Sequence, residues 1–264
     1  MRKHYADTPH GQIHYIASGT GDPLFLLHQT PRSSDEYRDV IPLVSDNHHV
    51  IAMDTLGFGA SDSPDEPWTI ELFAAGVLAL ADSLNIQQFD IVGHHTGGVV
   101  GIEVAASNPQ RVRSLVLSGV PYVDAERRRK VALGPTIDGV PLSTDGSHLK
   151  QLRQKRAPFY PLDRPDLLDR LLVDALKVGA RVEEGHQAVN NYRMEDRIES
   201  VYAPTLILCG ELDTFSLPDV PRLVAHLRDS RQSILPGTGV PSVDHKPDQF
   251  AKEVLRFLDS LAAQ

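Results

Sequence analysis

The stretch DIVGHHTGGVV, residues 90–100, is the most informative part of this sequence. Apolar residues lead to a glycine, and small and apolar residues follow it, which predicts a strand, a sharp turn and a helix. Gly93 and Gly97 occupy the glycine positions of the pattern Gly-x-nucleophile-x-Gly, where only small residues leave room for so tight a backbone. The residue between them is His95, where Ser, Asp or Cys is usual. The turn therefore predicts an imidazole presented at the start of a helix.

Length, composition and charge exclude several classes of protein. The 264 residues suffice for one large α/β domain, and 41% hydrophobic with 23% charged residues is ordinary for a globular chain. The net charge of −9 argues against nucleic acid as a partner, and no apolar run approaches the roughly 20 residues that span a bilayer. The single cysteine and the absence of an apolar leader favour a reducing compartment. We therefore expect a cytoplasmic monomer or homodimer that acts on a small molecule, with no membrane partner.

Five short apolar runs end in turn residues and are predicted to be strands covered on both faces. They are residues 23–28, 48–54, 89–94, 113–119 and 204–210. Residues 69–86 and 248–263 instead place apolar side chains three and four positions apart, and Thr69 precedes the first of these helical patterns. The alternation of strands and helices predicts a doubly wound, mostly parallel α/β sheet.

Residues 122–199 differ from the rest of the chain. Their patterns are helical, prolines separate them, and no convincing strand is present. We predict a helical cap over the carboxyl edge of the sheet, where ligands bind in such folds, with residues 1–121 and 200–264 forming the core. The basic run from Arg127 to Lys130 is most simply a solvated helix face.

Five segments in this order resemble the α/β-hydrolase fold superfamily, in the capped branch of haloalkane dehalogenases, epoxide hydrolases and esterases. They are LFLLHQTPRSSDEY (24–37), IAMDTLGFGASD (51–62), GHHTGG (93–98), PTLILCGELD (204–213) and ILPGTGVPSVDHKPDQFAKEVLRFL (234–258). The resemblance covers nearly the whole chain and implies about eight strands with helices on both faces.

The resemblance also assigns positions in a catalytic site, and two of three depart from the family pattern. His95 takes the place of the nucleophile, and Val240 takes the place of the catalytic histidine. Asp213 matches the catalytic acid, which would orient an imidazole. His245 lies five residues after Val240 and is a possible substitute base, although a surface or capping role is the simpler interpretation.

His95 retains a chemical role that does not need serine. A neutral imidazole can act as general base or as nucleophile, and the amino end of a helix disfavours its charged form. The resemblance implies an oxyanion hole made by the backbone N–H groups of Thr96 and, in the loop after residue 28, Thr30. The alternative is that the site has decayed and His95 only fills space.

Further substrate contacts are expected from four residues: Gln29 and Arg32 beside the oxyanion loop, and His186 and Tyr192 in the cap. Solvent exposure or a helix-surface position is the alternative for the last three. His28 and His94 match positions where the family carries structural histidines, so we expect neither a metal formed by them with His95 nor a cofactor.

Three functions remain open. The first is hydrolysis of an ester, lactone or similar carbonyl compound by His95 with Asp213 in support. The second is a cofactor-free lyase, decarboxylase or C–C cleaving reaction, which needs a base and an oxyanion hole but no acyl-enzyme. The third is a non-catalytic protein that binds a small molecule. The titratable group at the turn favours the first two.

Overall fold

The computed structural model describes residues 1–262, which form an eight-stranded sheet with the order β1-β2-β4-β3-β5-β6-β7-β8. β2 pairs antiparallel with β1 and β4, and all the other neighbouring strands are parallel. The predicted eight-stranded, mostly parallel sheet is thus confirmed. The strands are β1 (Arg2–Thr8), β2 (Gly11–Ser18), β3 (Asp22–Leu27), β4 (His48–Met53), β5 (Phe89–His94), β6 (Val112–Ser118), β7 (Thr205–Gly210) and β8 (Ser230–Leu235).

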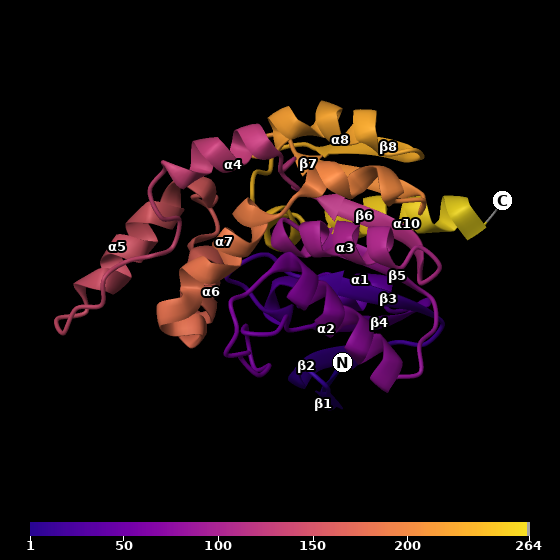
Figure 1. Cartoon of the computed structure of the whole chain (residues 1–264), viewed down its shortest axis with the longest axis horizontal. Coiled ribbons are helices and arrows are strands. Elements are labelled where there is room, and N and C mark those ends of the chain that lie inside the picture. The colour runs from indigo at the N-terminus through magenta and orange to yellow at the C-terminus, as the bar shows by residue number, and fades with distance from the viewer. Residues whose placement is uncertain (263–264) are drawn as a thin grey trace.

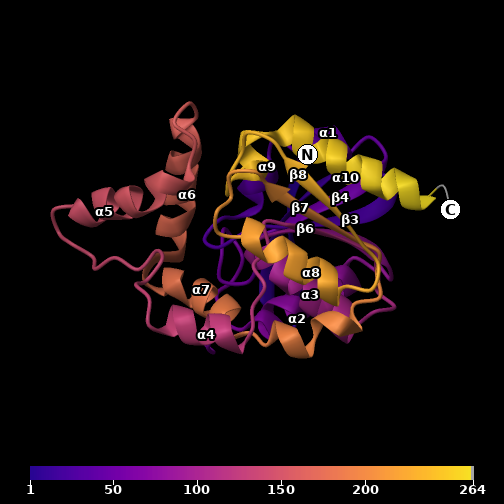
Figure 2. The same ribbon diagram turned by 90° about the horizontal axis from the view of Figure 1, so that it is seen from above.

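Helices cover both faces of the sheet, as Figures 1 and 2 show. One face carries α1 (Ile41–Val44) and α10 (Pro247–Ala262), and the other carries α2 (Ile70–Ser83), α3 (Thr96–Ser107) and α8 (Val220–His226). The short α9 (Ser242–His245) precedes α10. Residue 263, included in the predicted last helix, lies outside the described residues.

Each strand contributes to two hydrophobic cores because successive side chains point to opposite faces. On β3, Leu24 and Leu26 pack in the core under α1 and α10, whereas Phe25 and Leu27 pack in the core under α2, α3 and α8. The other central parallel strands alternate in the same way. This double burial explains the continuous apolar runs from which the strands were predicted.

The five predicted strands are found within one residue at either end. The helix predicted over 69–86 is found at Ile70–Ser83, so it ends three residues early. Thr69 caps its start, because its hydroxyl accepts a hydrogen bond from the N–H of Leu72 at 3.1 Å. No described helix combines the length and the apolar composition that crossing a membrane requires.

A helical region is inserted between β6 and β7, and no residue from 122 to 199 lies in a strand. Its helices are α4 (Ala125–Ala132), α5 (Ser147–Arg156), α6 (Pro165–Val178) and α7 (Val182–Asn191), and they lie together beside the sheet with α5 projecting outward (Figures 1 and 2). This region also contains the 3-10 turns η2 (Ala157–Phe159), η3 (Gly179–Arg181), η4 (Met194–Asp196) and η5 (Ile198–Ser200). Two more 3-10 turns, η1 (Ser34–Tyr37) and η6 (Leu217–Asp219), lie outside it. The division into a core of 1–121 and 200–264 and a separate cap domain stays a prediction.

Candidate active site

His95 lies in a strained turn between β5 and α3. Its φ of 44° and ψ of −109° place a residue with a side chain in a region that such residues rarely adopt. A Cβ atom on Gly93 would lie 2.4 Å from the carbonyl oxygen of Gly97, and one on Gly97 would lie 2.0 Å from that of Leu27. Both positions therefore require glycine, and the turn has the geometry that the motif predicts.

The imidazole of His95 faces Asp213, which follows β7. Nε2 of His95 lies 3.6 Å from Oδ2 of Asp213, slightly beyond hydrogen-bond distance. The other carboxylate oxygen, Oδ1, accepts hydrogen bonds from the backbone N–H groups of Phe215 and Ser216, each at 3.0 Å. The carboxylate is thus held in one orientation toward the ring. The structure brings together two of the three predicted catalytic residues.

The surroundings of His95 favour its neutral form. Burial is the largest cause that lowers its pKa well below the ordinary value, and electrostatic interaction with His94, Arg156, His186 and Arg127 lowers it further. Among the described residues, neither ring nitrogen of His95 makes a hydrogen bond, and Nε2 is buried. Burial also raises the pKa of Asp213, against the effect of its backbone hydrogen bonds. The site therefore presents a neutral imidazole with a lone pair that no protein group occupies.

The two predicted oxyanion donors lie side by side, but one of them is occupied. The N–H of Thr30 donates to the hydroxyl of Thr96 at 3.2 Å, and that hydroxyl donates to the hydroxyl of Thr30 at 2.9 Å. The N–H of Thr96, in the first turn of α3, has no acceptor among the described residues. A substrate oxygen must therefore displace the Thr96 hydroxyl before both N–H groups can bind it.

Gln29 lines the cavity, yet its amide group does not point donors at a substrate. Its side-chain Nε2 donates to Oε1 of Glu36 at 2.7 Å, and its backbone N–H donates to Oε2 at 2.9 Å. The carboxylate of Glu36 thus fixes the loop that carries Thr30. Gln29 contributes to the shape of the site more than to hydrogen bonding within it.

A cavity of about 710 Å³, including its mouth, opens above these residues at the carboxyl ends of β3, β5, β6 and β7. The position is the usual ligand site of such sheets. The lining combines the turn between β5 and α3 (the elbow), the loops after the other strands and the inserted helices. Its residues are Gln29, Thr30, His95, Thr96, Pro121, Arg127, Ile137, Arg156, Phe159, His186, Val189, Asn190, Phe215 and Val240.

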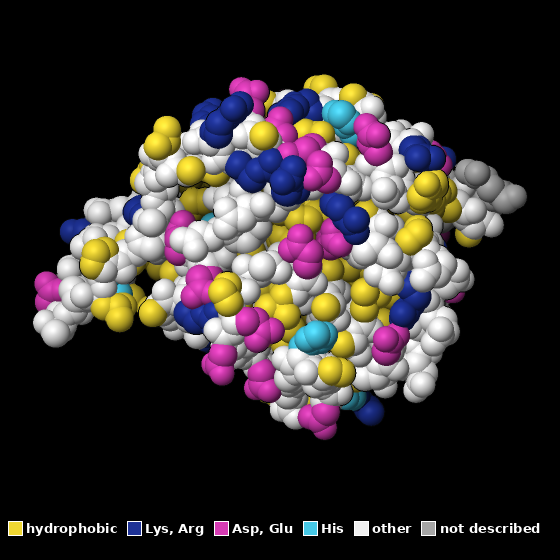
Figure 3. Space-filling view, in the orientation of Figure 1, with side chains coloured by type: hydrophobic (Ala, Val, Ile, Leu, Met, Phe, Trp, Pro, Cys, Tyr) yellow, Lys and Arg dark blue, Asp and Glu magenta, His cyan; other side chains and the backbone are white. Residues whose placement is uncertain are grey.

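Two arginines of this lining, Arg127 and Arg156, were not predicted from the sequence. Arg127 belongs to the basic run interpreted as a solvated face, and only Arg129 and Lys130 of that run are exposed. Figure 3 shows basic side chains over α4 with acidic side chains beside them, and Arg127 itself turns inward. Arg156 lies at the end of α5 in a sequence with no helical amphipathic signal. Their partners are distant in the chain, so no local pattern identified them.

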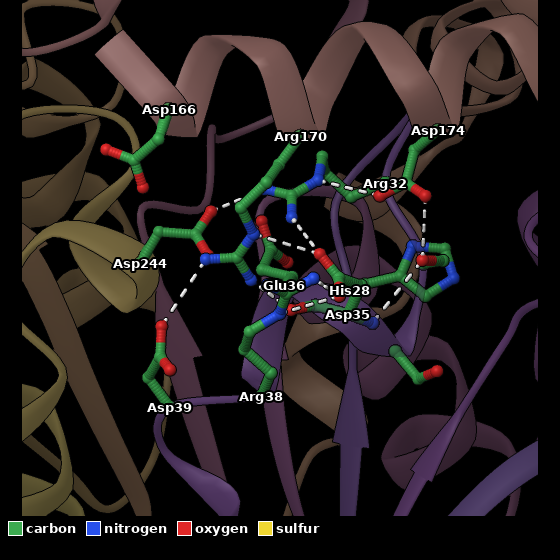
Figure 4. A network of polar contacts seen from close by, with 12 residues as sticks. His28, Arg32, Asp35, Glu36, Arg38, Asp39, Asp166, Arg170, Asp174 and Asp244 are labelled. Atoms are coloured by element: carbon green, nitrogen blue, oxygen red, sulfur yellow. Dashed lines mark hydrogen bonds and ion pairs between the residues drawn. The ribbon is translucent and has the colours of Figure 1, made fainter. Parts of the chain in front are cut away.

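The guanidinium of Arg32 is occupied by protein carboxylates and does not line the cavity, which corrects its interpretation as a substrate ligand or an exposed residue. The side chain is fully buried, with Nε 2.9 Å from Oδ2 of Asp174 on α6 and with Nη1 bonded to Asp244. Figure 4 shows this network, in which Arg170 of α6 also contacts Asp35 and Asp244. Arg32 therefore joins the core to the inserted helices.

Two other predicted residues lie outside the cavity lining. The hydroxyl of Tyr192 donates to Glu103 at 2.7 Å, a carboxylate that Arg197 also binds. Nδ1 of His245 lies 3.0 Å from the Thr238 hydroxyl, and its Nε2 lies 3.7 Å from Asp163. Tyr192 thus bonds to α3, and His245 does not meet His95 in this structure.

Four further positions singled out in the sequence are Val240, His186, His28 and His94. Val240, which the resemblance aligns with the catalytic histidine, lines the cavity, and His186 lines it from α7. His28 binds the backbone, with Nδ1 2.9 Å from the carbonyl of Gln29 and Nε2 accepting from the N–H of Thr55. Nδ1 of His94 contacts Ser118, and burial lowers the pKa of His94 to about 4. Within residues 1–262, no group of three His, Cys, Asp or Glu residues is arranged to hold a metal ion.

Comparisons with known proteins agree with this fold. Residues 22–240 match the family described as alpha/beta hydrolase fold, so the chain belongs to that family. Haloalkane dehalogenase 2 of Mycobacterium tuberculosis is 25% identical over 94% of this chain and 92% of its own length. The crystal structure of an enol-lactonase from Burkholderia xenovorans superposes with a TM-score of 0.80 and 21% identity, covering 97% of this chain and 100% of the other.

A shorter match has higher identity. The cis-3-alkyl-4-alkyloxetan-2-one decarboxylase of Shewanella oneidensis is 33% identical over 121 residues, which are 44% of this chain and 38% of that protein. The chain is therefore a member of the α/β-hydrolase family, with relatives among its dehalogenases and in this decarboxylase.

Proposed function

We propose that this protein hydrolyses a small carbonyl compound, an ester or a lactone, with His95 as general base and Asp213 as the group that orients it. The observation that carries the proposal is a distance of 3.6 Å between Nε2 of His95, in the turn between β5 and α3, and Oδ2 of Asp213, which follows β7. A buried carboxylate beside an imidazole selects its tautomer and stabilises the imidazolium that forms during proton transfer.

The reaction follows from the placement of these groups. Neutral His95 takes a proton from a water molecule, and the resulting hydroxide adds to the substrate carbonyl carbon. Negative charge develops on the carbonyl oxygen, which the N–H groups of Thr96 and Thr30 bind once the Thr96 hydroxyl has turned away. The tetrahedral intermediate collapses, and the imidazolium returns the proton to the leaving oxygen. Direct attack by His95 on the carbonyl is the covalent variant of this scheme.

Two features argue against a serine mechanism. His95 replaces the serine, and Val240, which cannot move a proton, lines the cavity where the serine's base would lie. Serine-directed fluorophosphonates are therefore expected to leave no adduct in the cavity.

A lyase or decarboxylase reaction is the second candidate. It is favoured by the match to a decarboxylase whose name gives a four-membered lactone as its substrate. The same base and oxyanion donors would serve, because removal of a proton or carbon dioxide needs no acyl-enzyme. A non-catalytic binding protein is the third alternative. In each case the proposed partner is a small molecule held under residues 122–199, which act as a lid.

The test compares His95→Ala and His95→Ser with wild type on a panel of small esters and lactones, including an oxetan-2-one assayed for carbon dioxide release. General-base assistance is typically worth about 10²–10⁴ in rate, so we expect His95→Ala to lose that factor in kcat with the fold unchanged. His95→Ser is expected to stay inactive, because no base lies beside it. His245→Ala is the matched control and should retain activity. Full activity of His95→Ala would favour the binding protein.

A further inference from the structure

The inserted helices place two cations on the wall of the cavity. Arg127 on α4 and Arg156 at the end of α5 both line it, and both contribute to the electrostatic potential at His95. Their side chains are 15% and 9% exposed. Cations so far removed from solvent need compensation, either from protein carboxylates or from a ligand.

Arg156 is compensated by the protein. Its Nε and Nη2 donate to the two carboxylate oxygens of Asp138 at 2.6 and 2.7 Å. Asp138 also lies 2.7 Å from Nε2 of His186. This bidentate pair leaves the positive edge of Arg156 facing the cavity as a polar wall, with its charge balanced.

Arg127 is compensated much less. Its only side-chain bond among the described residues is a single contact of 3.2 Å from Nη1 to Asp219, whose same oxygen accepts the N–H of Tyr122. Nε of Arg127 is buried without a hydrogen-bond partner. Burial lowers the pKa of Arg127 despite the nearby carboxylates of Asp219 and Asp124. Arg127 is thus a desolvated cation with free donors on the cavity wall.

One aromatic ring connects this cation with the catalytic imidazole. The guanidinium carbon of Arg127 lies 4.7 Å from the ring centre of Phe215, and the same ring lies 6.2 Å from the ring of His95. The three side chains therefore form one wall of the cavity. A molecule whose anionic group contacts Arg127 can extend along Phe215 to His95.

We propose that the substrate carries a carboxylate that binds Arg127, with Arg156 beside it, while its reacting carbonyl group faces His95 across Phe215. The proposal rests on the proposed function for the role of the carbonyl, but the anion site itself does not depend on catalysis. Arginine suits this task because its planar donors match the geometry of a carboxylate.

Binding of the substrate carboxylate also changes the pKa of His95, the proposed base. The charges of Arg127 and Arg156 help to keep the pKa of His95 low in the free protein. A bound carboxylate offsets part of this positive potential, so the pKa of His95 rises toward neutrality when substrate is present. The imidazole is then a stronger base in the complex than in the free enzyme.

The test measures the affinity of two matched pairs, acetate with acetamide and phenylacetate with phenylacetamide, by titration calorimetry at constant ionic strength. In wild type at least one carboxylate should bind about tenfold or more tightly than its amide, the value of one charge-assisted hydrogen bond. Arg127→Gln should abolish this preference and Arg127→Lys should keep most of it, which separates loss of charge from loss of fold. Arg129→Gln, on the exposed face of the same helix, is the matched control and should retain the preference.

The same titration on His95→Ala separates the two proposals. The preference for carboxylates should persist there even if His95 proves dispensable for catalysis. Equal affinity for carboxylates and amides, absence of binding by both carboxylates, or a preference that survives in Arg127→Gln would overturn the anion site.

Discussion

In the proposed mechanism, the length of the His95 side chain accounts for the absence of the usual histidine. In a serine triad the serine is too short to reach the acid, so an imidazole lies between them, takes the serine proton itself and is oriented by the carboxylate. The ring of His95 spans that space itself and approaches Asp213 to 3.6 Å. A histidine at position 240 would then have no task, and Val240 contributes an apolar surface to the cavity instead.

Gly119 offers a test of this pair without touching either member. A Cβ atom there would lie 3.0 Å from Nε2 of His95 and 3.2 Å from Oδ2 of Asp213. We expect Gly119→Ala to displace the ring and to lower kcat at least tenfold, measured on the substrate found with the ester and lactone panel. Its φ of 58° also predicts a loss of about 1 kcal/mol in the free energy of unfolding.

Gly237 provides the matched control for the backbone effect. Its φ is 66°, and no atom lies within 4 Å of an added Cβ. Gly237→Ala should therefore lose similar stability with unchanged kcat. A similar fall of kcat in both variants would show that general destabilisation, and not contact with His95 and Asp213, lowers activity.

For single residues, the motifs predicted which side chains of the site lie close together. They did not predict the hydrogen-bond partners of the arginines. His95, Asp213, Thr30 and Thr96 come together because a turn or a strand end fixes each of them. The partners of Arg32 could not be predicted because Asp174 and Asp244 lie 142 and 212 positions away. No local pattern shows whether an arginine meets solvent, substrate or a distant carboxylate.

Among the secondary-structure elements, α6 is joined to the core by several ion pairs. Arg170 and Asp174 of this helix meet Arg32, Asp35 and Asp244 in the network of Figure 4. Arg32, Asp174 and Asp244 are buried, so removing one of them leaves another buried charge without its partner. The network joins the inserted helices to the loop that carries Thr30.

Asp244 makes this connection sensitive to pH. Burial raises its pKa to about 6, although the charges of Arg32 and Arg170 oppose the shift and that of Glu36 adds to it. A carboxyl whose pKa is higher in the folded state contributes stability that is greatest below its unfolded pKa, near 4, and that is lost as the pH rises to about 6. Asp244→Asn removes this titration.

The prediction concerns the difference in free energy of unfolding, wild type minus Asp244→Asn, measured by urea denaturation from pH 4 to 8. This difference should fall as pH rises from about 4 to 6, by up to about 1.4 kcal/mol per pH unit, and stay constant above pH 7. A difference that rises over the same interval would show a carboxylate with a lowered pKa.

The strands that sequence patterns did not locate are those without continuous apolar runs. β1 and β8 are the edges of the sheet and have mostly exposed side chains, and β2 pairs with β1 in an antiparallel hairpin. An edge strand is covered less on both faces, so its sequence carries a weaker signal than a central strand. The resemblance supplied their number, but the residue pattern did not supply their positions.

For the whole molecule, the sheet and the inserted helices divide the proposed chemistry between them. The carboxyl ends of β3, β5 and β7 lead to the oxyanion loop, the imidazole and the acid. The inserted helices contribute Arg127, Arg156 and His186, the charged wall of the cavity. The residues at the strand ends could be predicted because they lie in sequence motifs of the fold family. The charged wall depends on how four helices pack, which their sequences do not show.

The most direct test of the central claim is the pH dependence of kcat/KM for wild type and His95→Ala on one substrate. If neutral His95 is the general base, wild-type kcat/KM should be constant at and above pH 7 and fall tenfold per pH unit below a pKa lower than 6.5. In His95→Ala the plateau should drop by about 10²–10⁴ and this acid limb should disappear. An unchanged acid limb with full activity in His95→Ala would contradict the account.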